Sequence, residues 1–131
     1  MLRIKTKVIP SETHGIGLYA GEFIPKGTIT WKRDPKIDIE FTEADVMDIP
    51  KEVREKFLWH RYYDYTIDKF IVCADDQRFI NHSSKNPNIK STPDMDVASR
   101  DIQEGEELLC NYRDYEIDWF ERRGYKESDF N

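Results

Sequence analysis

Three short segments of the sequence hold the residues whose types and spacing could support chemistry. The first is Gly15-Ile16-Gly17, where alternate glycines let the backbone approach a ligand closely. The second is Asn81-His82-Ser83, which offers an amide, an imidazole and a hydroxyl for hydrogen bonding. The third runs from Glu107 to Tyr112 and ends in a phenol. Together they could hold a polar ligand and orient a reacting group beside it.

Each segment also has a purely structural interpretation. The glycine segment could be a tight entry to a strand, and it is not a dinucleotide fingerprint because a third glycine and a long following helix are missing. Asn81-His82-Ser83 could be a turn with polar caps, since Asn and Ser favour such places. The stretch 101–112 could be a hairpin that ends in a core strand. Taken one at a time, the segments leave both interpretations open.

Taken in order, the segments resemble the motifs of the SET domain family, which transfers methyl groups from S-adenosylmethionine to lysine side chains. The matching stretches are Gly15 to Ala20, Arg78 to Ser83 with Pro87-Asn88, and Gly105 to Leu108 with Tyr112. The resemblance covers roughly Ile4 to Tyr112, and the compact form looks like the small stand-alone SET proteins of bacteria. It implies a mainly β (α+β) fold of several small curved sheets, with a C-terminal thread-through (pseudoknot) and two or three short helices.

The resemblance also implies which residues bind S-adenosylmethionine. The main chain of Gly15, Ile16 and Gly17 would hold the methionine part. Asn81 would bind the amino-acid end, and the backbone at His82 would read the adenine edge.

Tyr112 is the catalytic residue that the resemblance implies, and it would also contact the cofactor. A free lysine has a pKa of about 10.4, so its amine must become neutral before it attacks a methyl group. A narrow apolar channel and a nearby sulfonium both disfavour the ammonium. A phenol would then align the amine with the methyl group in a near-attack geometry. Trp119 and Phe120 are the best candidates for closing the lysine channel and packing on the adenine.

Two positions depart from the family pattern. Three residues, 84–86, separate Ser83 from Pro87 where two are usual, and we expect a bulge or a looser turn to absorb the extra one. Cys110 stands where many relatives have a second tyrosine, which affects the expected wall of the channel. The main alternative function is therefore a catalytically inactive SET-like module that binds cofactor or a peptide. A purely structural β domain would require all three motifs to be coincidences.

Short strands and a few helices are expected to position these segments. The pattern predicts strands at 3–9, 15–20, 28–31, 36–41, 69–74, 97–99 and 108–112. In the strand 36–41, Ile37, Ile39 and Phe41 are predicted to share an apolar face. The strongest helix is predicted between Pro50 and about Arg61, with Val53, Phe57 and either Leu58 or His60 on one face. A helical turn capped by the Thr42 hydroxyl and a final helix from Tyr115 to Arg123, ended by Gly124, complete the prediction.

The composition fits one domain spanning residues 1–131, in which 113–131 form a closing segment. Charged residues make up 35% of the 131 residues and hydrophobic ones 38%, which predicts a small core under a densely ionised surface. The sequence contains no apolar run long enough for a membrane span and no signal peptide, so we expect a cytoplasmic protein. Cys73 and Cys110 are expected to be reduced and buried, and no metal site is expected.

The net charge of −6 is unevenly distributed. Residues 94–131 contain twelve acidic and five basic side chains. This balance argues against a nucleic-acid partner. It would suit a basic protein or peptide substrate with an exposed lysine, although an ordinary solvated surface explains the charge alone more simply. The sequence does not identify the substrate, the number of methyl groups added or whether the chain forms a homodimer.

Overall fold

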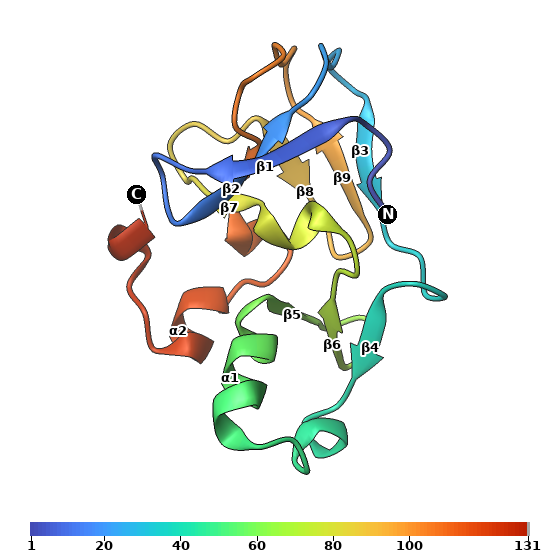
Figure 1. The fold of residues 1–131 in the computed structure, drawn as a ribbon, viewed down its shortest axis with the longest axis vertical. Helices are drawn as coiled ribbons and strands as arrows, with labels where there is room; N and C mark the ends of the chain where they lie inside the picture. Colours follow the sequence, from blue (N-terminus) through green and yellow to red (C-terminus); the bar gives the residue numbers. More distant parts are fainter. Residues whose placement is uncertain (131) are drawn as a thin grey trace.

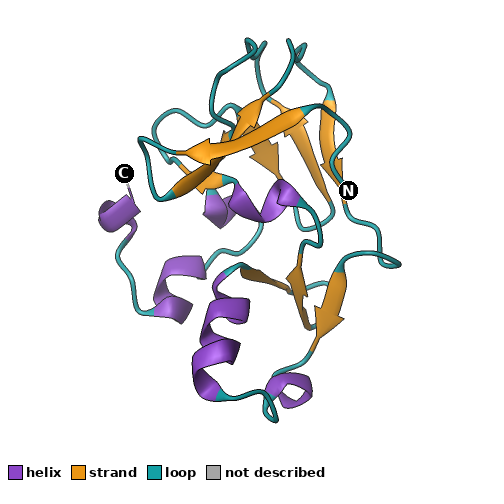
Figure 2. Ribbon diagram, in the orientation of Figure 1, coloured by secondary structure: helices purple, strands orange, loops and turns teal. Residues whose placement is uncertain are grey.

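The computed structural model describes residues 1–130 and consists mainly of short strands in three small sheets (Figures 1 and 2). The first sheet pairs two antiparallel strands, β1 (Thr6–Pro10) and β2 (Ile16–Ala20). The second has five strands in the order β3 (Ile29–Lys32), β9 (Met95–Ala98), β8 (Ile89–Ser91), β10 (Leu109–Cys110) and β7 (Asn81–His82). The third is antiparallel, in the order β4 (Ile39–Phe41), β6 (Lys69–Val72) and β5 (Arg61–Asp64). The predicted fold class, mainly β with several small sheets, is confirmed.

The helices are short. Two are α-helices, α1 (Lys51–Trp59) and α2 (Trp119–Arg123). Single 3₁₀ turns occur at η1 (Ala44–Val46), η2 (Asp76–Phe79), η3 (Tyr112–Asp114) and η4 (Glu127–Phe130). Figure 1 shows α1 and the β4-β6-β5 sheet at one end of the molecule, with the other two sheets at the opposite end. Within residues 1–130, no helix is long and apolar enough to cross a membrane.

The segment leading to Tyr112 passes between two strands that are joined by a loop. β10 lies between β7 and β8 and is parallel to both. The amide of Ser83 donates to the carbonyl of Cys110 (2.9 Å) at one end of the 83–88 loop, and that of Asn88 donates to Leu109 (3.0 Å) at the other. This is the expected thread-through. The Asn86 amide donates to the Ser83 hydroxyl (3.1 Å), so a looser turn absorbs the extra residue of this loop.

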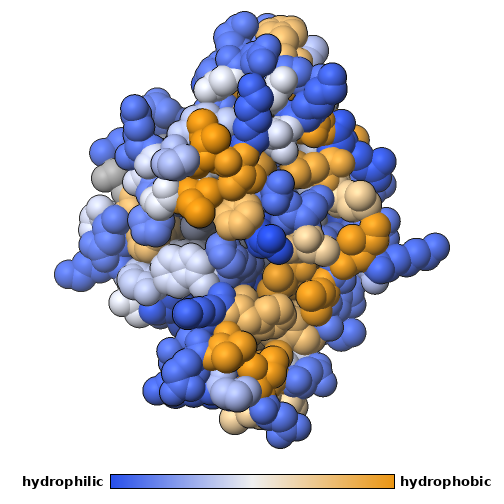
Figure 3. All heavy atoms as spheres, viewed as in Figure 1, coloured by the Kyte–Doolittle hydropathy of each residue, from blue (hydrophilic) through white to orange (hydrophobic). Residues whose placement is uncertain are grey.

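The core is divided among the three sheets, as expected for a small domain with many charged residues. The largest cluster of buried residues joins β2, β8, β9 and β10, and it contains Cys110, while Cys73 belongs to a second cluster around Trp31. Both cysteines are buried and free, as predicted. Figure 3 shows hydrophilic side chains around most of the outline of one face, with separate apolar patches between them.

The predicted apolar face of the strand 36–41 is wrong. Only Phe41 is buried, where it packs on Phe57 of α1 and Phe70 of β6. Ile37 precedes the strand, and Ile39 at its first position remains 46% exposed. Alternation puts Ile39 and Phe41 on one face, but aromatic rings of α1 and β6 cover the Phe41 end of that face and leave Ile39 exposed.

Three helix predictions also need correction. α1 follows Pro50 as expected, but Val53 on its predicted face is exposed. The Thr42 hydroxyl does not cap η1 by accepting from an amide. The capping runs in reverse, since the Asp45 carboxylate accepts from the Thr42 hydroxyl (2.9 Å) and from the Thr42 amide (2.7 Å). The last helix begins at Trp119 rather than Tyr115, since η3 occupies the chain before it, and it ends at Gly124 in the left-handed conformation as predicted. β5, β7 and β8 were not predicted.

Candidate functional site

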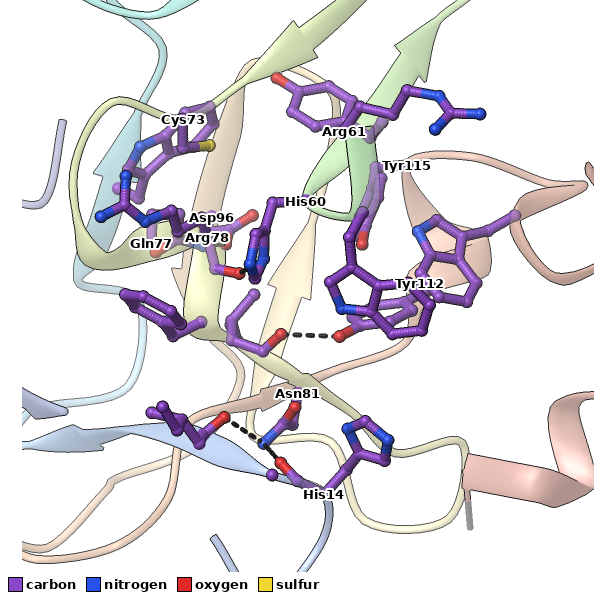
Figure 4. A pocket seen from close by; sticks show the side chains of 18 of the residues that line it. His14, His60, Arg61, Cys73, Gln77, Arg78, Asn81, Asp96, Tyr112 and Tyr115 are labelled. Carbon is purple, nitrogen blue, oxygen red and sulfur yellow. Dashed lines mark hydrogen bonds between the residues drawn. The ribbon is translucent and has the colours of Figure 1, made fainter. Parts of the chain in front are cut away.

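A cavity of about 270 Å³ brings the three predicted segments together (Figure 4). From these segments it is lined by Gly15, Ile16, Asn81 and Tyr112, and α2 contributes Trp119. The other predicted site residues, Gly17, His82 and Phe120, are buried behind this lining. Residues of three motifs that are far apart in the sequence are therefore neighbours in space.

Asn81 ties the glycine segment to the rest of the cavity. Its side-chain nitrogen donates to the carbonyls of His14 (2.9 Å) and Ile16 (3.1 Å). Figure 4 shows the nitrogen directed at these carbonyls, with the amide oxygen on the side away from them. The same nitrogen lies 2.9 Å from a carboxylate oxygen of Glu107. The two N–H groups of the Asn81 side chain are thus shared among three acceptor oxygens. The Asn81 side-chain oxygen remains available to accept a hydrogen bond from another partner.

Glu107 is a positioning residue that the sequence prediction did not include among the site residues. Its carboxylate accepts hydrogen bonds from the hydroxyls of Ser11 (2.7 Å), Thr13 (3.1 Å) and Tyr19 (3.3 Å), in addition to that of Asn81. It therefore holds both ends of the β1–β2 connection against β7. The sequence offered an indication of this role, because Glu107 is the first residue of the motif whose last residue is Tyr112.

Gly17 is required by this network because of close packing, and its predicted main-chain contact with the cofactor stays a prediction. A Cβ placed there would lie 2.3 Å from the Glu107 carboxylate and 2.9 Å from the Ser11 Cβ. Gly15, in contrast, has a φ of +54° and open space around the position of a Cβ. The two glycines of one motif therefore serve different ends, close packing at Gly17 and a left-handed turn at Gly15.

Gly17→Ala is expected to destabilise the protein by about 1–3 kcal/mol, the usual cost of overpacking. Gly15→Ala is expected to cost about 1–2 kcal/mol from its backbone conformation alone. Urea unfolding of each variant, alone and combined with Glu107→Ala, separates the two causes. The cost of Gly17→Ala should shrink in the Glu107→Ala background, where the closer of the two clashes is gone and only that with Ser11 remains, and the cost of Gly15→Ala should not change. Equal costs of Gly17→Ala in both backgrounds would contradict this assignment.

Tyr112 lies at the centre of the cavity. Its hydroxyl donates to the carbonyl of Ile80 (2.7 Å), and its amide donates to the Nδ1 atom of His82 (3.2 Å). Burial raises the pKa of the phenol well above its ordinary value, so the hydroxyl stays protonated at neutral pH. Since its one proton is used on Ile80, the oxygen presents lone pairs to a ligand in the cavity.

Aromatic side chains from the C-terminal segment cover Tyr112. The ring of Trp119 lies 4.6 Å from that of Tyr112, and Phe130 lies 5.7 Å from Trp119. Phe130 also reaches the ring of His14 (5.4 Å), and both residues line the cavity. The C-terminal segment therefore supplies Tyr115, Trp119 and Phe130 to the lining of the cavity. Trp119 lines the cavity directly, whereas Phe120 is fully buried and supports His82 from behind (4.9 Å).

His82 supports the site from within the core. Its ring is almost fully buried, with Nε2 3.4 Å from a Glu127 carboxylate oxygen. Burial lowers its pKa, and this effect outweighs the opposing effect of Glu127. The imidazole is therefore neutral at physiological pH, with Nδ1 as an acceptor. Its predicted contact with adenine, through the backbone, stays a prediction.

No group of three or more His, Cys, Asp or Glu side chains within residues 1–130 is arranged to hold a metal ion.

Comparison with known proteins gives the same family as the motifs. A model of the SET domain matches residues 15–113. No curated protein matches the sequence. Two solved structures share the fold at low identity. One is a candidate histone methyltransferase of Plasmodium falciparum, with 19% identity, a TM-score of 0.60 and coverage of 85% of this chain and 95% of that chain. The other is ctPRC2, with 22% identity, a TM-score of 0.61 and coverage of 83% and 14%.

A third solved structure is more similar in sequence. CpSET8 from Cryptosporidium is 29% identical, with a TM-score of 0.55, and the match covers 84% of this chain and 58% of that one. The chain therefore spans little more than half of this relative and a seventh of ctPRC2.

Proposed function

Because this chain belongs to the SET domain family, we propose that it transfers methyl groups from S-adenosylmethionine to lysine side chains of a protein or peptide. The observation that carries the proposal is the convergence of Gly15, Asn81 and Tyr112 on one cavity under an aromatic cover. These residues lie far apart in the sequence, and the fold brings them to one cavity.

The residues present suit the amino-acid end of S-adenosylmethionine. An α-amino group needs hydrogen-bond acceptors, and the carbonyls of His14 and Ile16 lie beside the Asn81 amide. Trp119 and Phe130 offer apolar faces to a flat aromatic group. When bound, the cofactor would supply a methyl group on a positively charged sulfur.

The protein's own contribution is alignment. A phenol that stays protonated is not a base, so Tyr112 cannot remove the proton of the lysine ammonium. Its oxygen can accept a hydrogen bond from the amine and hold the nitrogen in line with the methyl group. Trp119 and the other aromatic side chains exclude water from the reacting groups.

The alternative is a SET-like module that binds cofactor or a peptide without catalysis. Cys110 is fully buried and does not line the cavity, and a turn absorbs the extra residue before Pro87. Neither departure from the family pattern reaches the cavity, which favours the enzyme. A basic protein or peptide as the partner and a cytoplasmic location remain proposals based on the sequence.

The purified protein is expected to bind S-adenosylmethionine in calorimetry and to transfer a labelled methyl group to lysine residues of proteins in a lysate. Binding should persist in the presence of EDTA. Peptide mapping of the labelled proteins identifies the modified side chain. Cofactor binding without any labelled lysine would favour the inactive module. Absence of cofactor binding would contradict the enzyme and leave only a module that binds a peptide.

A further inference from the structure

The cavity continues past Tyr112 into a part that the cofactor residues do not occupy. We call this part the inner chamber, and it is lined by Trp31, Tyr62, Cys73, Gln77, Asp96 and Tyr115. Figure 4 shows Cys73, Asp96 and Tyr115 on the opposite side of the Tyr112–Ile80 hydrogen bond from Asn81 and His14. Tyr112 thus separates the inner chamber from the half that faces the glycine segment.

Asp96 is the only carboxylate among the described residues that line the cavity. It is 4% exposed and accepts a hydrogen bond of 2.5 Å from the Gln77 side chain. Arg61 and Arg78 line the same cavity, yet no cationic side chain within residues 1–130 forms an ion pair with Asp96. A buried carboxylate is costly unless a cation or several donors compensate it. The chamber thus presents an acid that lacks a positively charged partner.

The walls of the inner chamber suit an alkylammonium group. Trp31 and Tyr62 are buried, and the ring of Tyr115 lies 5.3 Å from that of Tyr62. Aromatic faces attract cations, and they also accommodate the methylene chain that carries one. Trp31 pairs with Asp96 across β3 and β9, and its Nε1 atom is buried without an acceptor among the described residues. A buried acid that has hydrogen-bond donors but no cationic partner among the described residues indicates that a cationic ligand belongs in this chamber.

We propose that the inner chamber binds the amine of the substrate lysine and that Asp96 accepts its proton, an inference that rests on the proposed function. The N–H bond of the ammonium breaks, and the proton passes to the Asp96 carboxylate. The neutral amine then forms the new N–C bond as the C–S bond of the sulfonium breaks. The products are a methylated ammonium, a neutral thioether and a protonated Asp96, which returns its proton to solvent when the product leaves. Tyr112 orients the amine, and Asp96 supplies the base that the phenol cannot be.

The surroundings of Asp96 suit this role. Burial raises its pKa to about 7, against the opposing hydrogen bonds of Ser91 and Gln77, and Asp114 adds to the rise. A carboxylate of this kind approaches the basicity of a lysine amine whose own pKa is lowered in an apolar chamber. The thiols of Cys73 and Cys110 face Asp96, and burial raises the pKa of each well above its ordinary value. The inner chamber also contains the phenols of Tyr62 and Tyr115, and burial raises the pKa of each. The rest of the lining adds His14, His60, Arg61, Arg78 and Tyr112 as titratable or charged groups, and burial lowers the pKa of His60.

The test uses Asp96→Asn, which keeps the shape of the side chain and an acceptor for Gln77. Asp48→Asn is the matched control, since it removes the same charge from an exposed position. The probe is n-butylamine, a mimic of the lysine side chain, added to protein loaded with demethylated cofactor. The ¹³C signal of the Asp96 carboxyl should titrate near pH 7, and the probe should lower that pKa, because a bound cation favours the carboxylate. Asp96→Asn should weaken probe binding at least tenfold and change cofactor affinity less than twofold.

Stability provides a second measurement. The folded pKa of Asp96, about 7, lies above that of an unfolded aspartate, 3.8. The stability that the protonated carboxyl contributes is therefore fully present below about pH 4 and is lost as the pH rises through 7. Asp96→Asn should melt at the same temperature as the wild type at pH 4 and several degrees higher at pH 8, while Asp48→Asn should follow the wild type.

Each outcome separates the two proposals. If the wild type binds cofactor but not n-butylamine, or if Asp96→Asn binds the amine as the wild type does, the role of Asp96 is contradicted and the methyltransferase proposal stands. A methylated peptide found by the labelling experiment allows turnover to be measured as well. Its rate should fall roughly 10²-fold in Asp96→Asn and lose the dependence on a group that titrates near pH 7. A wild type that binds no cofactor contradicts the proposed function itself.

Discussion

Tyr112→Phe is expected to retain cofactor binding within a few-fold and to lose methyl transfer by about 10²–10³-fold, the range associated with removing one preorganised polar group. The ring remains, so its contacts with Trp119 and His82 are preserved. The hydroxyl is lost, and with it the oxygen that would hold the amine. The Ile80 carbonyl also loses its donor, which should cost about 1 kcal/mol of stability. Cofactor affinity, melting temperature and turnover are to be measured on the same variant.

Tyr62→Phe is the matched control for this variant. The Tyr62 hydroxyl also lines the cavity and also donates to a backbone carbonyl, that of Pro93, at 2.7 Å. Both substitutions therefore remove a phenol oxygen and one hydrogen bond to the main chain. We expect a similar loss of stability in the two variants and a large loss of turnover only in Tyr112→Phe. Near-normal turnover in a folded Tyr112→Phe protein would end the catalytic assignment of Tyr112.

The sequence predicted the part of the site that depends on motifs. Gly15, Ile16, Asn81 and Tyr112 meet at one cavity because the thread-through places β7 and β10 side by side, and only the family resemblance supplied that topology. Periodicity alone gave the fold class and most strands. It failed where neighbouring elements cover one end of a strand's face and not the other, as at β4, and where a carboxylate reverses an expected cap, as at Asp45.

Asp96 shows why the inner chamber was not predicted. Its strand was predicted only from Val97, so Asp96 fell outside the predicted strand, where an acid needs no explanation. In the structure β9 begins at Met95, and Asp96 and Ala98 share the buried face. Once the strand is known to begin at Met95, the alternation that buries Ala98 also predicts a buried Asp96. The boundaries of strands are, however, the feature that a sequence predicts least well.

The excess of acidic residues in 94–131 overstates the free negative charge of that region. Arg113 pairs with Glu121 and Glu127, and Arg100 pairs with Glu106. Glu116 is fully buried between Arg122 and Arg123. Much of the charge that suggested a basic partner therefore serves to hold the closing segment in place. A count of charges cannot distinguish paired from free groups, because pairing depends on the fold.

Asn81→Ala is expected to weaken cofactor affinity by roughly 10–150-fold, which corresponds to the 1.5–3 kcal/mol of a hydrogen bond to a charged group. Alanine removes the amide oxygen that would accept from the cofactor's amine. It also removes the donor that holds the carbonyls of His14 and Ile16, so the glycine segment loses its fixed position. The variant should therefore lose stability as well as affinity, and calorimetry with thermal unfolding measures both.

Ser11→Ala distinguishes these two losses. The Ser11 hydroxyl bonds the same Glu107 carboxylate as Asn81 does, but Ser11 does not line the cavity. Its loss should loosen the glycine segment and lower the melting temperature, with at most a few-fold change in affinity. If Asn81→Ala loses stability to the same extent as Ser11→Ala and keeps its affinity for S-adenosylmethionine, Asn81 is a structural clamp. Its role would then end at the carbonyls that it holds, and the cofactor's amine would have to find its acceptors elsewhere in the cavity.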